Sequence, residues 1–235
     1  FRKQIGHHRS HPTARWALPE NILQKLEIVA LKFKSQDEIL SDSYLFDEQY
    51  PEFIEGRQFK NWKKNDEEML QRRITFVEKI IEKYGIVKIF DLANETEHPY
   101  LYGNTLALCT NLTDEDSLLV YGLIDSGNQK HYSLSSSFIR GRESKTSLDV
   151  QTEILYKLIN SGISNQGIIN FLCSLWDSIN LWKFVAGTKN DEIEKLFWKA
   201  KKQQFFYADN KEELLYILGK LQQFGKPITF LNTLG

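Results

Sequence analysis

Hydrophobic residues follow a helical spacing soon after the start of the chain. Beyond Pro19, the apolar positions Ile22, Leu26, Val29 and Phe33 are three or four residues apart. This period predicts an amphipathic helix, and a proline is favoured in the first turn of a helix because its missing N–H has no partner to lose.

A second helical pattern covers residues 65–84. Asn65 and Glu68 have the spacing of a capping box, and Gly85 supplies a residue that tolerates the left-handed conformation at which helices often end. Residues 1–16 are basic, and their apolar positions follow neither the helical nor the strand period. This favours an arm or an irregular edge segment. Residues 41–64 combine turn formers with aromatic residues, which favours a loop or short-strand region.

Between residues 86 and 139 the pattern is typical of short strands separated by turns. The predicted strands are IVKIFDL, NTLALCTNL, SLLVYGLID and KHYSLSSSFI. Within "LLVYGLIDSGNQKHYSLSS", Asp125 ends one strand and Lys130 begins the next, around a Ser-Gly-Asn turn. Short connections of this kind favour an antiparallel meander.

The remaining sequence is helical in pattern, with helices expected near 148–160, 165–184, 190–206 and 210–224. The sequence therefore predicts an α+β fold in which a helix is followed by an antiparallel β-meander and then a helical C-terminal region. The expected organisation has three parts: a basic arm, helix and irregular segment over 1–64, a helix plus β-meander core over 65–145, and a helical region packed on that core over 146–235.

Composition limits the possible functions. The chain has 30 basic and 31 acidic residues, so any nucleic-acid footprint must be local. Cys109 and Cys173 lie far apart in apolar runs, which is typical of core thiols in a reducing compartment. No apolar stretch reaches about 18 residues and no secretion signal is seen, which favours a cytoplasmic protein without a membrane partner.

Basic residues gather in short clusters, some beside aromatic residues, and this combination suits phosphate contact with base stacking. The alternative for each cluster is a solvated charged face. The predicted nucleic-acid-binding residues are Arg2, Lys3, Arg9, Arg15, Lys60, Lys63, Lys64, Arg140, Arg142 and Lys145.

The sequence supports a catalytic or metal site less well than it supports nucleic-acid binding. Asp125 and Lys130 resemble part of a restriction-type nuclease site, but residue 128 is Asn where such a site needs an acid, which favours a plain hairpin. The histidines of "GHHRSH" lack the further ligands of structural zinc. Neither a phosphate-binding glycine loop nor a nucleophile elbow occurs, so we expect no catalytic residues, no metal and no cofactor, and an enzyme is not favoured.

Residues 151–176 form an apolar helix, a Ser-Gly-Ile-Ser turn and a second helix, which is also the spacing of a helix-turn-helix. The second helix carries Ile168, Phe171 and Leu172 where a groove-reading helix needs polar side chains. A packed αα-hairpin is therefore the preferred interpretation.

Residues 74–142 resemble the C-terminal region of TnsE, the target-selecting DNA-binding family of some transposons. The resemblance is carried by "ITFVEKIIEKYG", "YLYGNTLALC" and "LLVYGLIDSGNQKHYSLSSSFIRG" in that order, and it covers under a third of the chain. It implies binding to duplex or branched DNA and contact with other proteins of a transposition or DNA-processing complex.

The leading hypothesis is a DNA-binding, non-catalytic targeting or accessory protein of a transposition, DNA recombination or DNA-processing assembly of a mobile element. One alternative is a protein-protein interaction or assembly subunit without a nucleic-acid role, and another is a restriction-type nuclease relative with a degenerate active site. The second hypothesis rests on aromatic residues of the C-terminal helices that could be exposed: Trp176, Trp182, Phe197, Trp198, Phe205 and Phe206.

Overall fold

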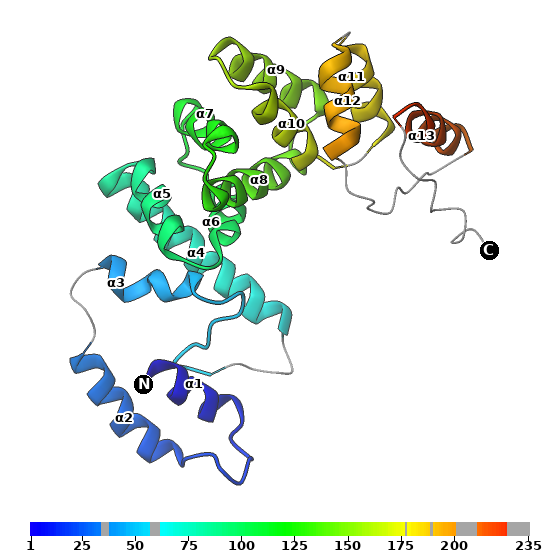
Figure 1. Cartoon of the computed structure of the whole chain (residues 1–235). Helices are drawn as coiled ribbons and strands as arrows, with labels where there is room; N and C mark the ends of the chain where they lie inside the picture. Colours follow the sequence, from blue (N-terminus) through cyan, green and yellow to red (C-terminus); the bar gives the residue numbers. More distant parts are fainter. Residues whose placement is uncertain (34–37, 57–61, 177, 189, 201–210, 225–235) are drawn as a thin grey trace. The chain divides into compact units, whose positions relative to one another are not determined.

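The structure, a computed structural model, describes residues 1–33, 38–56, 62–176, 178–188, 190–200 and 211–224. Within these ranges the regular structure is entirely helical and contains no strand (Figure 1). The predicted α+β fold and its antiparallel meander are therefore wrong. The chain separates into two compact units, 1–113 and 114–235, and each is described by itself.

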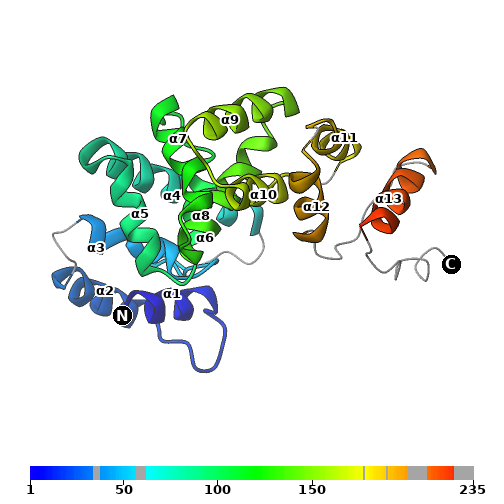
Figure 2. The ribbon, with the colours of Figure 1, turned by 45° about the horizontal axis from the view of Figure 1, so that its top comes forward.

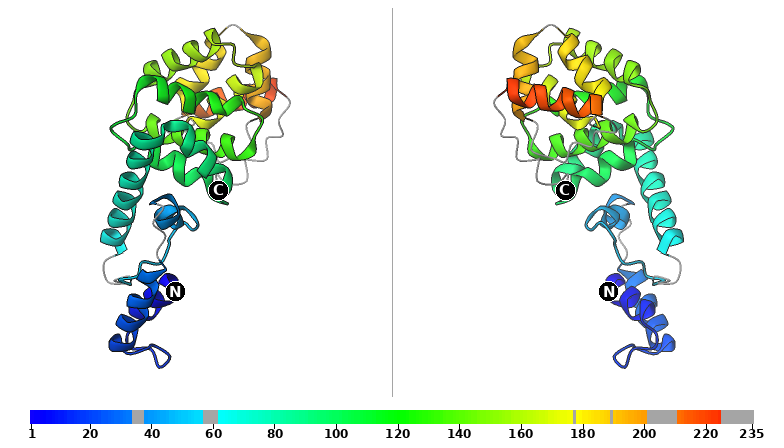
Figure 3. Two further views of the ribbon diagram at one scale, coloured as in Figure 1. Left: turned by 90° about the vertical axis from the view of Figure 1, so that its left-hand side faces the viewer. Right: turned by 90° about the vertical axis from the view of Figure 1, so that its right-hand side faces the viewer.

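The first unit is built around a long helix, α4, which contacts α5, α6 and η1. Figure 3 shows α4, in cyan, as one long uninterrupted helix. Its elements are α1 (Arg2–Ser10), α2 (Glu20–Lys32), α3 (Glu38–Asp42), the 3-10 helix η1 (Ser43–Phe46), α4 (Trp62–Tyr84), α5 (Ile86–Glu95) and α6 (Pro99–Leu106).

The core of the first unit includes a stacked aromatic pair, Phe46 and Tyr102, with ring centroids 3.8 Å apart. Beside them Arg73 is only 5% exposed. Its guanidinium donates to the backbone oxygens of Leu45 and Glu48, each at 2.8 Å. Burial lowers the pKa of Arg73, but a guanidinium stays charged at any ordinary pH, so these carbonyls must satisfy its donors.

The second unit is a helical array centred on α8 and α10, which contact each other. Figure 2 shows α7 beside α9 in this unit, as their contacts require. Its elements are α7 (Asp114–Gly122), the 3-10 helix η3 (Leu123–Asp125), α8 (Gln129–Glu143), α9 (Leu148–Asn160), α10 (Asn165–Ser174), α11 (Ile179–Gly187), α12 (Asp191–Ala200) and α13 (Lys211–Gln223).

The four predicted strands are helices or the links between them. In the first, Ile86, Ile89, Phe90 and Ala93 are buried, which is the helical spacing of one face of α5. A short apolar run does not distinguish a buried helix from a buried strand by periodicity alone. The buried positions of α5 are three or four residues apart, which is the spacing of a helix face and not of a strand face.

The supposed hairpin around the Ser-Gly-Asn turn is instead the start of α8. The Asn128 side chain accepts hydrogen bonds from the backbone N–H groups of Lys130 and His131, as an N-cap does. Alternation of serine with apolar residues in "HYSLSSSF" imitated a strand. Ser135 is nevertheless fully buried, and its hydroxyl donates to the Tyr121 carbonyl at 3.2 Å.

The basic N-terminus is not an irregular arm. Residues 2–10 form α1, in which Ile5 is 1% exposed. Gly6 lies very close to the loop that follows η1. A Cβ atom on residue 6 would be only 1.9 Å from the Phe53 carbonyl oxygen. This close approach explains why α1 needs a glycine at a position where helix propensity alone would favour alanine.

The helices predicted after residue 146 agree well with the structure. The predicted helices 148–160 and 210–224 correspond to α9 and α13, whereas 165–184 divides into α10 and α11. Residues 151–176 do form a packed αα-hairpin: Ile169 and Leu172 are 1% and 0% exposed, so α10 is a core helix. Among the described residues no helix is both long and apolar enough to cross a bilayer.

Candidate nucleic-acid interface

One of the predicted basic clusters lies at the C-terminal end of α8. Leu134, Phe138 and Ile139 are fully buried and fix the orientation of this helix within the second unit. Arg140 and Arg142 follow in its last turn. Cations in this position also interact favourably with the negative end of the helix dipole. The prediction of a strand ending at Ile139 is wrong here, since α8 continues to Glu143.

Trp176 lies beside this helix end although it comes from the segment after α10. Its backbone N–H donates to the Glu143 carboxylate at 2.7 Å, which ties the two segments together. The Arg140 guanidinium lies 5.2 Å from the centroid of the Trp176 ring. Arg140 also donates from Nε to the Ser174 carbonyl at 3.4 Å. These contacts hold the arginine and the indole side by side.

The indole of Trp176 is 60% exposed, an unusual state for so large an apolar side chain. Arg140 is exposed as well, and exposed Lys145 lies two residues beyond the end of α8. We call Arg140, Lys145 and Trp176 the α8-end patch. It combines an aromatic face on which a base could stack with cations that could meet phosphates.

Arg142, the third predicted cation of this cluster, lies against the interior instead. Its guanidinium is 5.4 Å from the Phe138 ring centroid, and its Nε is buried with no hydrogen-bond partner among the residues that the structure describes. Close by, burial raises the pKa of Tyr121 to about 12, an effect that the positive charge of Arg142 partly offsets. Arg142 therefore belongs to the helix packing and is not placed to contact a phosphate.

The N-terminal cluster is also occupied by internal contacts. Arg9, whose side chain is 13% exposed, pairs with Glu20 and with Glu27, each at 2.7 Å. The hydrogen bonds that Arg9 donates to the carboxylates of Glu20, foremost, and Glu27 raise its pKa. Its guanidinium also donates to the Ile54 carbonyl at 2.8 Å. Arg9 thus joins α1, α2 and the loop after η1.

Two other predicted cations of α1 have similar roles. The Arg2 guanidinium lies 3.8 Å from the Tyr44 ring centroid and donates to the Ser41 carbonyl. Lys3 is exposed and pairs with Glu48. This hydrogen-bonded carboxylate raises the pKa of Lys3. The cluster that the sequence presents as a basic arm is therefore largely neutralised.

The other predicted cations lie in the first unit. Arg15 and Lys63 are exposed, and neither has an ion-pair partner among the described residues. Lys64 is exposed in the first turn of α4. Lys60 lies outside the described residues. The predicted cations are therefore divided between the two units, with Arg140, Arg142 and Lys145 in the second.

The histidines of α1 surround an aromatic residue and do not converge on a metal. His7 stacks on Trp16 with ring centroids 4.9 Å apart, and His8 and His11 lie 5.4 and 5.5 Å from the same ring. The His8 Nδ1 atom accepts the backbone N–H of Leu18. No group of three or more His, Cys, Asp or Glu side chains in the described ranges could hold a metal ion.

Asp125, the acid of the possible nuclease site, has a structural role. Its carboxylate accepts the Ser164 backbone N–H at 2.8 Å and the Ser164 hydroxyl at 2.5 Å. Ser164 in turn caps α10 by accepting the Gly167 N–H at 3.1 Å. Asp125 therefore ties η3 to the start of α10. Lys130 lies in the first turn of α8.

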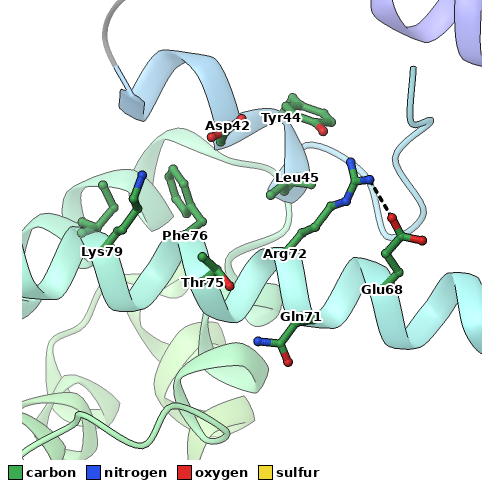
Figure 4. A pocket seen from close by; sticks show the side chains of 10 residues that line it. Asp42, Tyr44, Leu45, Glu68, Gln71, Arg72, Thr75, Phe76 and Lys79 are labelled. Atoms are coloured by element: carbon green, nitrogen blue, oxygen red, sulfur yellow. Dashed lines mark hydrogen bonds and ion pairs between the residues drawn. The ribbon is translucent and has the colours of Figure 1, made fainter. Parts of the chain in front are cut away.

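A pocket of about 320 Å³ lies between η1 and α4 (Figure 4). Its apolar wall includes Leu45 and Phe76, and burial raises the pKa of the Tyr44 hydroxyl at its edge. Figure 4 shows Arg72 directed toward Glu68, with which it pairs at 2.6 Å. This arginine is thus occupied, and the pocket contains no nucleophile paired with a base. Its geometry indicates no reaction.

Of the aromatic residues proposed for a partner surface, only one is confirmed as exposed. Trp182, Phe197 and Trp198 are at most 1% exposed and form the core of α11 and α12. Phe205 and Phe206 lie outside the described residues. The pairing of Trp176 with Arg140 was missed in the sequence because 36 positions separate the two residues, and no local pattern joins them. Comparisons with protein-family profiles, curated proteins and solved structures gave no match to this chain.

Proposed function

We propose that this chain is a non-catalytic DNA-binding protein whose contact surface includes the α8-end patch. The observation that carries the proposal is the exposed Trp176 indole held 5.2 Å from the Arg140 guanidinium. An aromatic side chain beside cations offers stacking to an unpaired base and charge to the adjacent phosphates. We therefore expect the patch to prefer single-stranded or branched DNA over a continuous duplex.

The charge around the patch supports an anionic ligand. Glu143, the acid in the last turn of α8, accepts a hydrogen bond from the Trp176 backbone N–H, which holds its carboxylate at that backbone, while Arg140 and Lys145 contribute two positive charges. Arg140 has no carboxylate partner among the residues that the structure describes. A phosphate could approach this guanidinium without displacing an existing ion pair.

A role in a transposition or DNA-processing assembly rests on a separate argument, the resemblance of residues 74–142 to the TnsE family. The resemblance assumes strands within residues 74–142, but the regular elements of that segment are helices. The DNA-binding part of the proposal is therefore independent of the assembly context. The structural role of Asp125 argues against a nuclease site at that residue, in keeping with the proposed non-catalytic function. We propose a cytoplasmic location for the protein.

Fluorescence anisotropy with a labelled oligothymidylate at ~50 mM salt tests this proposal. Trp176→Ala should weaken binding by about 1 to 3 kcal/mol, the usual cost of losing one stacked base. Trp16→Ala is the matched control, because that indole is 50% exposed and belongs to the other unit. Equal affinity of the wild type and the Trp176 variant would contradict the proposed site.

A further inference from the structure

The second helix of the chain has an apolar surface that nothing in the described structure covers. Only Leu23 of α2 is buried, at 2% exposure. Ile28, Val29 and Leu31 are 58%, 39% and 58% exposed. A helix of a globular unit normally turns its apolar residues toward the core, so this amount of exposed apolar surface indicates a contact site.

Two lysines share this surface in a defined pattern. Lys25, Ile28, Val29 and Lys32 occupy positions i, i+3, i+4 and i+7, which lie together on one side of a helix. We call these four residues the α2 face. Both lysines are exposed, and neither has an ion-pair partner among the described residues. The side chains of Ile28 and Val29 therefore lie between two lysines that have no ion-pair partner in the described ranges.

The acids of the same helix lie on its other side and cannot neutralise these lysines. Glu20 and Glu27 are both bound to Arg9, which holds α2 against α1. Figures 1 and 3 show α1 and α2 side by side. The contacts with α1 therefore leave the α2 face available, with a local charge of two positive groups.

We propose that the α2 face binds an acidic amphipathic helix of another protein. The two lysines are seven residues apart, which places them about 10 Å apart along the helix axis. A partner helix with apolar residues between two carboxylates at the same spacing would bury Ile28 and Val29 while pairing both cations. Complementary charge across such an interface sets the orientation and suppresses other partners.

The same pattern disfavours three other occupants. A second copy of the chain packed through this face by a twofold axis would bring lysines against lysines. A lipid surface would receive the two lysines on the same side as the apolar residues, whereas membrane-bound helices carry their cations on the opposite face. Nucleic acid would neutralise the lysines but leave Ile28 and Val29 exposed to water.

Three synthetic helical peptides of about 18 residues test this proposal with the full chain. Each carries two leucines between two variable positions seven apart, and these positions hold Glu, Gln or Lys. Fluorescence anisotropy should rank affinity in that order, with the Glu peptide at least about tenfold tighter than the Lys peptide. Equal binding of the three peptides, or binding of none at ~100 μM, would overturn the proposal.

Charge reversal on the protein supplies the decisive control. The Lys25→Glu and Lys32→Glu double variant should invert the ranking, so that the Lys peptide binds tightest. Lys157→Glu, at an exposed position of α9, should leave the ranking unchanged. Val29→Ser should weaken binding of the Glu peptide without altering the helical circular dichroism, since Val29 is one of the exposed positions of α2.

Two further measurements test whether a second copy of the chain or a lipid surface occupies the α2 face. Sedimentation velocity tests for a dimer, and co-sedimentation tests binding to vesicles of phosphatidylcholine and phosphatidylserine. A dimer that Val29→Ser dissociates, or vesicle binding that the same variant abolishes, would assign the α2 face to that occupant and overturn the proposal. The inference is independent of DNA binding, so Trp176→Ala should leave peptide binding intact.

Discussion

Asp125 joins two elements of the second unit through a single serine. Ser164 donates two hydrogen bonds to its carboxylate and caps α10 with its own hydroxyl oxygen. Gly167 is part of the same arrangement, because a Cβ atom there would lie 2.6 Å from the Asp125 Cγ. The glycine is therefore required for the close approach of η3 to α10.

Asp125→Ala should destabilise the second unit by about 1 to 3 kcal/mol, because a capping hydroxyl and a backbone donor lose their acceptor. Chemical denaturation followed by tryptophan fluorescence measures this change. Glu153→Ala, at an exposed position of α9, serves as the control and should be nearly neutral. Unchanged stability combined with loss of a Mg²⁺-dependent DNA cleavage would instead restore the nuclease hypothesis.

Tyr121 should make the second unit sensitive to alkali. Burial raises its pKa from 10.0 to about 12 in the folded state, so above pH 10 the unfolded chain releases a proton that the folded chain retains. Stability is therefore present below pH 10 and falls between pH 10 and about 12.

The Tyr121→Phe variant tests this dependence, since it lacks the ionisable hydroxyl. It should lose about 2 kcal/mol less stability than the wild type over that pH range. Urea denaturation at several pH values measures the difference. Parallel pH profiles of the two proteins would show that the Tyr121 hydroxyl does not cause the alkaline loss.

At the scale of elements, sequence patterns placed some helix starts correctly and others wrongly: α4 begins at Trp62, so Asn65, predicted as a cap, lies inside the helix. Ser147 and Ser164 accept the N–H groups of Val150 and Gly167, and the helices that they start were predicted at the correct residue. Asn128 caps α8 in the same way, but it was interpreted as a turn residue because serines alternate with apolar residues after it.

The candidate interface was only partly predictable for a related reason. Basic residues close in sequence suggest a shared surface, but Arg2, Lys3 and Arg9 meet carboxylates and carbonyls from segments distant along the chain. Such pairs depend on tertiary contacts that no local pattern encodes. Arg140 could be named from the sequence, whereas its stacking partner could be identified only from the fold.

The packing of α10 leads to a prediction for its buried residues. Ile169→Ala and Leu172→Ala should each destabilise the protein by about 2 to 4 kcal/mol, because each leaves a cavity in a close-packed core. Tyr156→Ala is the control, since that side chain is 56% exposed and its loss should cost little. Near-wild-type melting of both α10 variants together with lost DNA binding would indicate a groove-reading helix instead.

At the scale of the whole molecule, a chain with a net charge of −1 must bind DNA through a local surface or not at all. Arg2, Lys3 and Arg9 are bound to other groups of the first unit, and the Nε atom of Arg142 is buried in the second. Arg140 and Lys145 are exposed at the end of α8, and Arg140 lies beside the exposed Trp176 indole. The expected footprint is therefore small, with about two phosphates and one stacked base.

The salt dependence of single-stranded DNA binding tests this account most directly. Each neutralised phosphate of a single strand contributes a slope of about −0.7 in the logarithm of affinity against the logarithm of salt concentration. The Arg140→Gln and Lys145→Gln double variant should flatten the wild-type slope by about 1.4, whereas the Arg15→Gln and Lys63→Gln double variant should leave it unchanged. An unchanged slope in the first variant, or no detectable binding by the wild type at ~50 mM salt, would contradict DNA recognition by the α8-end patch.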